Sequence, residues 1–91
     1  MADWRAENAE HLRGLRLQRR RYTKWSEQWD HDHCSGCSAK FAEFDGPDIL
    51  HEGYTTCGDF SRPPGYEWVC PDCFSQLKDE MGWTEASGGT A

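Results

Sequence analysis

The sequence has few hydrophobic residues for its length. Only 36% of its 91 residues are hydrophobic, whereas an ordinary globular protein has roughly 45–50%. A chain this short and polar buries little apolar surface, and domains of this kind usually depend on disulfides or a bound metal. Because a domain usually contains roughly 100–200 residues, we expect one domain that a covalent or metal cross-link stabilises.

The sequence also lacks a long apolar run. It opens with MADWRAENAEHLRG, which is too polar for a secretory signal peptide or a membrane span. Five cysteines are present, and an odd number does not form a closed disulfide framework. We therefore predict a cytoplasmic protein without membrane association, whose reduced cysteines bind metal.

Basic residues are scarce outside the first quarter of the chain. Residues 1–24 contain seven basic and three acidic residues, a balance of +4. Residues 25–91 contain three basic and thirteen acidic residues, a balance of −10, so that the formal net charge is −6. An acidic body repels phosphate backbones, and nucleic acid is therefore a disfavoured partner.

The N-terminal third is predicted to form one long amphipathic helix over residues 3–29. At 100° per residue, one face of this helix collects its large apolar side chains. These are Trp4, Leu12, Leu15, Tyr22, Trp25 and Trp29. Asp3 is the predicted N-cap. Gly14 weakens the helix by about 1 kcal/mol relative to alanine and marks a bend or a break.

The rest of the chain is predicted to contain short strands and a second helix. The runs KFAEF, DILHEGYTT and YEWV are separated by the loop signals DGPD and SRPPG, as expected around strands. Phe74, Leu77 and Met81 recur at helical spacing, and this helix is expected to end near Gly82. The predicted parts of the chain are therefore a helix packed on the body, a zinc-finger domain and a disordered tail, over residues 1–29, 30–84 and 85–91.

Four of the five cysteines form two C-x-x-C pairs, Cys34-Ser-Gly-Cys37 and Cys70-Pro-Asp-Cys73, with 32 residues between them. The two-residue gap lets a tight turn direct both sulfurs to one point, where backbone amides favour the thiolate form. Four thiolates at the corners of a tetrahedron are the ligand set of closed structural zinc sites, and iron can occupy the same sulfur cage. We predict one zinc ion bound by all four of these cysteines.

The order of the elements predicts the fold class. The interval between the two cysteine pairs exceeds the 15–20 residues usual for such motifs, so it has room for one or two hairpins. The second pair leads directly into the helix that contains Phe74 and Met81. We predict a small zinc-stabilised α+β domain, a treble-clef or zinc-ribbon-like finger with a long N-terminal amphipathic helix.

Three stretches, KWSEQWDHDHCSGCSAKF, LHEGYTT and YEWVCPDCFSQLKDEMGW, cover about half of the chain. In these stretches the sequence resembles an uncharacterised family of small bacterial zinc-knuckle proteins. The shared pattern is W-x-H-D-H-C-x-x-C-x-x-K-F followed by W-x-C-x-x-C-F. This resemblance implies a small bacterial zinc-binding protein and no particular substrate.

The sequence disfavours a catalytic zinc site. Catalytic zinc takes three protein ligands, often histidines, and keeps one position open for water. The nearest similarity is to the cytidine-deaminase signature, H-x-E followed by P-C-x-x-C. Here His51 and Glu52 are adjacent, and Pro71 lies inside its C-x-x-C pair. We predict no enzymatic activity and no small-molecule substrate.

Four further residues carry groups that can ligate metals. His31 and His33 flank Asp32 just before the first cysteine pair, and we interpret them as hydrogen-bonding supports for that pair. The alternative is a second metal site or the replacement of one cysteine ligand. His51 is interpreted as a strand residue, with metal ligation as the alternative. Cys57 is interpreted as a core or loop thiol, with redox sensing or metal exchange as the alternative.

The tryptophans are candidates for the core. Trp25, Trp29, Trp68 and Trp83 are predicted to pack the N-terminal helix against the zinc layer, because each indole buries a large apolar area. Trp4, at the far end of the helix, is equally consistent with a core residue and with an aromatic anchor for a partner.

The segment RLQRRRYTK is the strongest argument for a nucleic-acid partner. On a helix, Arg13, Arg16 and Arg20 would share a face and could clamp phosphates. Thirteen acidic residues follow in the same small body, which favours intramolecular ion pairs or a solvated face. The same arginines would also suit an acidic protein surface.

We therefore predict a non-enzymatic zinc-binding module that contacts a protein partner, such as an adaptor, an immunity-type protein or an assembly subunit. The contact surface would be the acidic loops around EFDGPD and TTCGDF, or the N-terminal helix. The alternative is a nucleic-acid-binding regulator that uses the arginines, and the second alternative is a zinc enzyme.

Overall fold

The chain folds into short helices and two small sheets. A computed structural model describes residues 4–24 and 26–86. Within these residues the elements, in chain order, are α1 (Trp4–Asn8), the 3-10 helix η1 (Glu10–Leu12), β1 (Arg16–Arg21), β2 (His31–His33), β3 (Lys40–Ala42), β4 (Ile49–Leu50), β5 (Glu52–Thr56), β6 (Trp68–Val69), α2 (Pro71–Met81) and β7 (Thr84–Glu85).

The larger sheet has four strands in the order β6-β5-β1-β7. β1 lies in its interior, antiparallel to β5 on one side and parallel to β7 on the other. The smaller sheet has the order β2-β3-β4, with β2 antiparallel and β4 parallel to β3. A parallel bridge between Cys34 and Trp68 joins the two sheets, so the first cysteine pair lies at their junction.

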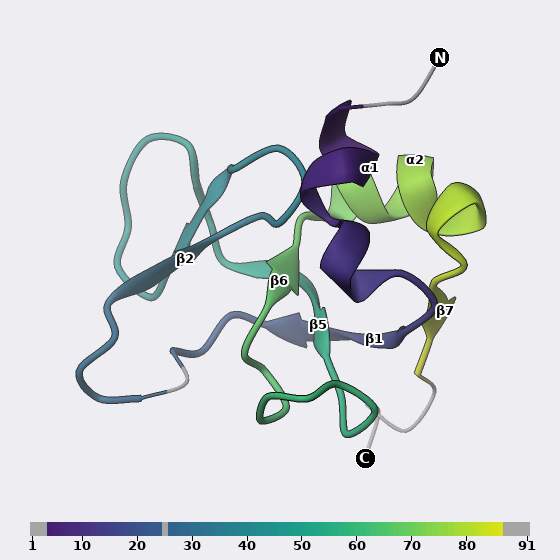
Figure 1. Cartoon of the computed structure of the whole chain (residues 1–91). Helices are drawn as coiled ribbons and strands as arrows, with labels where there is room; N and C mark the ends of the chain where they lie inside the picture. Colours follow the sequence, from purple (N-terminus) through teal and green to yellow (C-terminus); the bar gives the residue numbers. More distant parts are fainter. Residues whose placement is uncertain (1–3, 25, 87–91) are drawn as a thin grey trace.

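The helices cover the larger sheet. α1, η1 and α2 lie together above β1 and β5 (Figure 1), and α1 contacts α2 directly. Leu12 and Leu17 are fully buried beside Leu77 and Met81 of α2. The apolar residues of these segments therefore close one core between helices and sheet.

Aromatic rings fill the remainder of the core. Tyr22, Phe41 and Trp68 form one cluster, with ring centroids 4.9–5.8 Å apart. A second stack joins β5 to α2, where the rings of Tyr54 and Phe74 lie 3.8 Å apart and nearly parallel. The predicted α+β class and the predicted short strands are confirmed by these elements.

The predicted second helix is confirmed and begins slightly earlier than its apolar repeat. α2 starts at Pro71, a residue suited to a first helical turn. It ends at Gly82, whose φ of +69° gives the left-handed C-cap that favours glycine. Phe74, Leu77 and Met81 are all buried, as their spacing indicates.

The predicted long N-terminal helix is wrong. The described part of residues 3–29 contains the five-residue α1, the three-residue η1 and the strand β1. Gly14 separates the helical and extended parts with a φ of +79°, and its N–H donates to the Met81 carbonyl. Pairing with β5 and β7 therefore overrides the helical propensity of an arginine-rich segment.

The outcome for the tryptophans is mixed. Trp68 and Trp83 are buried as predicted. Trp29 was predicted to lie in the core but is 40% exposed, because no helix carries it onto the sheet. Trp4 is 60% exposed. Trp25 lies outside the described residues.

The boundary of the predicted tail also differs. Glu85 was assigned to the tail but belongs to β7, where it pairs with Leu17. The amide of Ala86 donates to the Leu17 carbonyl at 2.8 Å. Residues 87–91 and the predicted cap Asp3 lie outside the described residues.

Candidate metal centre

The first cysteine pair occupies a tight turn directly after β2. The amide of Gly36 donates to Cys34 Sγ at 3.4 Å, and the amide of Ser38 donates to the Cys34 carbonyl at 2.9 Å. A Cβ on Gly36 would lie 3.1 Å from Cys73 Sγ. The absence of a side chain at Gly36 therefore lets the two cysteine pairs approach closely.

The second pair is built into the start of α2. Cys70 is the N-cap of this helix, and its Sγ accepts a hydrogen bond from the Cys73 amide at 3.4 Å. The Cys70 amide donates across the centre to Cys34 Sγ at 3.2 Å. The positive end of a helix dipole favours negative charge, so this position suits a thiolate.

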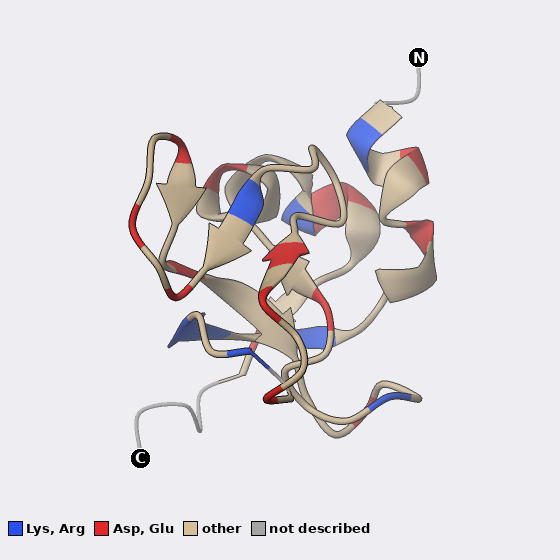
Figure 2. Ribbon diagram, turned by 90° about the vertical axis from the view of Figure 1, so that its left-hand side faces the viewer, with Lys and Arg blue, Asp and Glu red and all other residues tan. Residues whose placement is uncertain are grey.

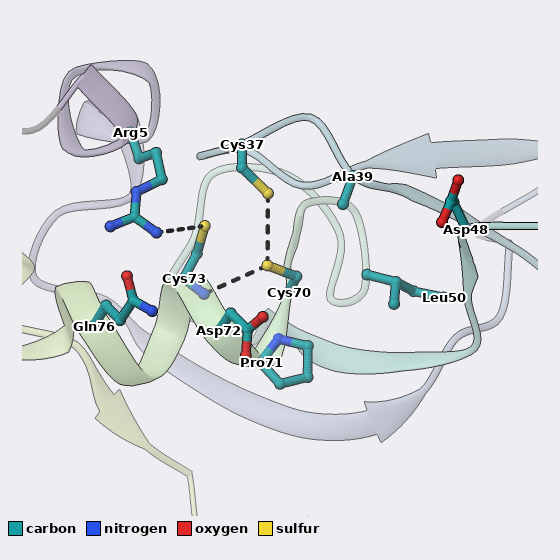
Figure 3. Close-up of a pocket in the computed structure, with 10 residues that line it drawn as sticks. All are labelled: Arg5, Cys37, Ala39, Asp48, Leu50, Cys70, Pro71, Asp72, Cys73 and Gln76. Atoms are coloured by element: carbon teal, nitrogen blue, oxygen red, sulfur yellow. Dashed lines mark hydrogen bonds between the residues drawn. The ribbon is translucent and has the colours of Figure 1, made fainter.

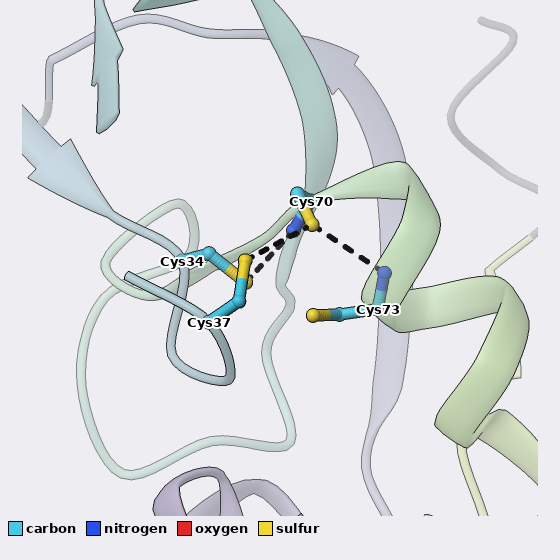
Figure 4. Close-up of side chains that lie close together, drawn as sticks. All are labelled: Cys34, Cys37, Cys70 and Cys73. Atoms are coloured by element: carbon cyan, nitrogen blue, oxygen red, sulfur yellow. Dashed lines mark hydrogen bonds between the residues drawn. The ribbon is translucent and has the colours of Figure 1, made fainter. Parts of the chain in front are cut away.

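The four sulfurs of Cys34, Cys37, Cys70 and Cys73 lie within 4.8 Å of one another (Figure 4). Zinc–sulfur bonds of about 2.3 Å in a tetrahedron place neighbouring sulfurs about 3.8 Å apart. The distance from Cys37 Sγ to Cys70 Sγ is 3.7 Å. Geometry and ligand chemistry therefore both fit a structural zinc ion, and the five cysteines of the chain are free of disulfides.

The sulfurs strongly affect one another's ionisation. Hydrogen bonds from the Cys70 and Cys73 thiols hold the pKa of Cys34 far below its usual range. The hydrogen bonds to Cys34 raise the pKa of Cys73 strongly and that of Cys70 to about 12. Four negative sulfurs this close together repel one another, so they need a cation among them.

Helix α1 lies against the centre, which the sequence did not indicate. The Arg5 guanidinium lies 4.0 Å from Cys73 Sγ through Nη1, and the Asn8 side-chain amide donates to the Gly36 carbonyl at 3.0 Å. A four-thiolate zinc site carries a net charge of −2, so a nearby guanidinium stabilises it. No pattern in the sequence identifies Arg5 as a neighbour of this centre, because Cys73 lies 68 residues away from it in the chain.

The two histidines before the first pair lie on one side of β2. Their ring centroids are 4.9 Å apart with the rings nearly perpendicular. His31 Nδ1 lies 2.7 Å from Asp30 Oδ1, whereas Asp32 accepts a hydrogen bond from the Tyr22 hydroxyl at 2.7 Å. Among the described residues, the only group of three or more metal-ligating side chains is the four cysteines. The role of His31 and His33 as supports or ligands stays a prediction.

His51 and Cys57 lie away from the sulfur cluster. His51 follows β4, and its Nε2 is 3.1 Å from the Phe44 carbonyl and 3.4 Å from Asp45 Oδ1. Cys57 follows β5, half-buried, with Sγ 4.0 Å from the Thr55 carbonyl. Burial, and then the charge of Asp59, raise the pKa of the Cys57 thiol.

The predicted arginine face is not formed. Arg13 follows η1 and pairs with Glu10 at 2.8 Å, whereas Arg16 and Arg20 lie in β1. The Arg20 guanidinium lies 5.9 Å from the Trp68 ring centroid. These three side chains therefore do not share one helix surface.

No helix within residues 4–24 and 26–86 is both long and apolar enough to cross a membrane. Comparison with protein-family models, curated proteins and solved structures gives no match for this chain.

Proposed function

We propose that the chain is a non-enzymatic protein-interaction module whose fold depends on one zinc ion. The observation that carries the zinc assignment is the convergence of four cysteine sulfurs within 4.8 Å. All four ligands come from the protein, and such a closed tetrahedron leaves no coordination position for a catalytic water. Iron in the same cage, and a zinc enzyme, are the alternatives that metal analysis must test.

We further propose a treble-clef-like arrangement around the zinc. Its support is the order of elements: a knuckle after β2, then strands β3 to β6, then a knuckle that starts α2. The absence of disulfides among the cysteines is consistent with the proposed reducing cytoplasm.

Substitution with cobalt tests the closed cage. A four-thiolate site gives strong tetrahedral absorption that added anions leave unchanged. A spectrum that shifts with anions would indicate an exchangeable position and would favour the enzyme alternative.

The proposed contact surface is the loop of residues 43–48 between β3 and β4. Phe44 is 48% exposed, and the loop also carries Glu43, Asp45 and Asp48. Acidic residues are spaced along this loop (Figure 2). The Lys40 ammonium lies 5.3 Å from the centroid of the Phe44 ring, and the charged residues of the loop itself are acidic. An exposed aromatic ring on a mainly acidic loop is typical of an anchor for a protein of opposite charge. A partner with a basic rim around an apolar pocket fits this loop.

The test is capture of the partner from native cells with zinc-loaded protein as bait. We expect Phe44→Ala and Asp45→Lys each to reduce recovery of the same protein at least about tenfold, the effect of an anchor residue worth more than 1.4 kcal/mol. Trp4→Ala is the matched control, because Trp4 is another strongly exposed aromatic residue and lies outside this loop. Loss of capture with Trp4→Ala alone would contradict the loop assignment.

The nucleic-acid alternative rests on the N-terminal arginines and needs a separate test. Binding to random duplex DNA should fall steeply with salt if these arginines contact phosphates. Absence of binding at low salt would remove this alternative.

A further inference from the structure

A hollow of about 500 Å³ opens beside the sulfur cluster. Three of the four cysteines, Cys37, Cys70 and Cys73, line it together with Arg5 and Leu50 (Figure 3). Cys34 does not line it. The centre is therefore closed by protein on one side and accessible to small molecules on the other.

The four cysteines differ in exposure. Cys34, Cys70 and Cys73 are 2%, 5% and 1% exposed. Cys37 is only partly buried. Of the three cysteines that line the hollow, Cys37 is therefore the residue most open to a reagent that enters it.

They also differ in their hydrogen bonds. Cys34 Sγ accepts from two backbone amides, Cys70 Sγ accepts from one, and Cys73 Sγ lies beside the Arg5 guanidinium. Within the described part of the chain, no N–H group donates to Cys37 Sγ, whose polar contact is Cys70 Sγ at 3.7 Å. Donors that stabilise a thiolate lower its basicity and with it its nucleophilicity. Cys37 therefore combines the greatest access with the least electrostatic stabilisation.

We propose that Cys37 is a modification site, the sulfur through which hydroperoxides oxidise this centre and release its metal. The inference rests on the proposed zinc cage. The Cys37 thiolate attacks a peroxide oxygen, so that the S–O bond forms, the O–O bond breaks and hydroxide leaves. The Cys70 thiolate then attacks the Cys37 sulfur, so that the S–S bond forms, the S–O bond breaks and a second hydroxide leaves.

The electrons balance in this scheme. The two thiolates lose two electrons in forming one disulfide, and hydrogen peroxide gains two in forming two hydroxides. The two sulfurs, now 3.7 Å apart, must approach to about 2.05 Å. Formation of the disulfide removes two of the four ligands, which is expected to release zinc and loosen the fold.

The test uses the zinc-loaded full chain and hydrogen peroxide. Released zinc is followed with a chromophoric chelator, and the oxidised cysteines are located by alkylation and tandem mass spectrometry. We expect the first product to be the Cys37–Cys70 disulfide, with about one zinc released per disulfide. Cys57 is the internal control and is expected to stay unmodified at this stage, since its raised pKa keeps it a thiol.

A pair of variants separates the reactive sulfur from its neighbours. Cys37→His keeps a zinc ligand but removes the nucleophile, and it should slow zinc release at least about tenfold. Cys57→Ser is the control, because Cys57 lies outside the sulfur cluster, and it should release zinc within about threefold of the rate of the unsubstituted protein. If Cys37→His does not bind zinc, the identity of the first disulfide formed in the unsubstituted protein tests the inference by itself.

Three results would overturn the inference: a first disulfide that omits Cys37, equal reaction at all four cysteines, or unchanged release from Cys37→His. These results are distinct from failure of the proposed function. A chain that binds no metal contradicts the zinc module itself, whereas a zinc-loaded chain that reacts at another sulfur contradicts only the role of Cys37.

Discussion

At Gly53, the larger sheet packs against the smaller sheet so closely that no space remains for a side chain. A Cβ at this position would lie 2.7 Å from two ring atoms of Phe41 and 2.8 Å from the Val69 carbonyl oxygen. Phe41 is fully buried, and the Val69 contact is with backbone, so neither can move freely. The absence of a side chain at Gly53 therefore lets β5 of the larger sheet pack closely on the Phe41 ring of the smaller sheet.

We expect Gly53→Ala to lower the free energy of unfolding by about 1–3 kcal/mol, the usual cost of overpacking a filled core. Urea denaturation at a fixed zinc concentration measures this change. Gly58→Ala is the control, because a Cβ there would meet nothing within 4 Å. Equal stability of the two variants would show that the core adjusts at Gly53.

At the scale of elements, Trp83 connects segments that are distant in sequence. Its ring stacks on Phe74 of α2, and its indole N–H donates to the Leu12 carbonyl of η1 at 2.9 Å. The next residues form β7 on the edge of the larger sheet. The helical N-terminal segment is thereby attached to the C-terminal part of the fold.

Trp83→Phe keeps an aromatic ring but leaves the buried Leu12 carbonyl without this donor. Because the Leu15 amide still donates to this carbonyl at 3.3 Å, we expect a loss of about 0.5–1.5 kcal/mol in the free energy of unfolding, the net contribution of one hydrogen bond. Trp4→Phe, at an exposed position, should change stability by no more than about 0.5 kcal/mol. Thermal unfolding of both variants tests the difference, and identical midpoints would argue against the Trp83 contact.

At the scale of the whole molecule, the sulfur centre joins segments that are distant in the sequence. It connects the turn after β2, the start of α2 and, through Arg5, helix α1. The apparent free energy of zinc binding to such a site, about 10–16 kcal/mol, is comparable with or larger than the typical stability of a domain, about 5–15 kcal/mol. Metal binding and folding are therefore expected to be one process.

Removal of zinc with a strong chelator should unfold most of the chain. Near-ultraviolet circular dichroism of the buried tryptophans, Trp68 and Trp83, should disappear and return when zinc is restored. Cys70→Ser should behave like the chelated protein, whereas Cys57→Ser should retain its zinc and its spectrum. A compact structure that persists without metal would contradict the proposed role of the cage.

Zinc affinity should also increase with pH. Without metal the pKa of Cys70 is raised to about 12 and that of Cys73 is raised further, so both are thiols near pH 7 and must lose protons to bind zinc. Release of at least these two protons predicts a rise in apparent affinity of at least about 100-fold per pH unit. Competition with a chelator of known pH dependence measures it between pH 6 and 7. An affinity independent of pH would contradict this proton release.

The sequence by itself determined the features that depend on short-range patterns. The C-x-x-C spacing predicted the four sulfurs that the fold brings together, and helical spacing with Gly82 predicted α2. Both signals work because neighbouring residues alone set a knuckle turn or a helix face. Gly14 also marked the real break in the N-terminal segment.

Only the tertiary structure decided the conformation of residues 16–21. Arg19 and Arg20 lie over the rings of Tyr54 and Trp68, so long charged side chains cover aromatic surface and hide the alternation expected of a strand. The pairing of β1 with β5 and β7 involves partners more than 30 residues away, as does the position of Arg5 beside Cys73. Contacts over such distances leave no local pattern, which is why the segment was predicted as a helix and folds as an interior strand.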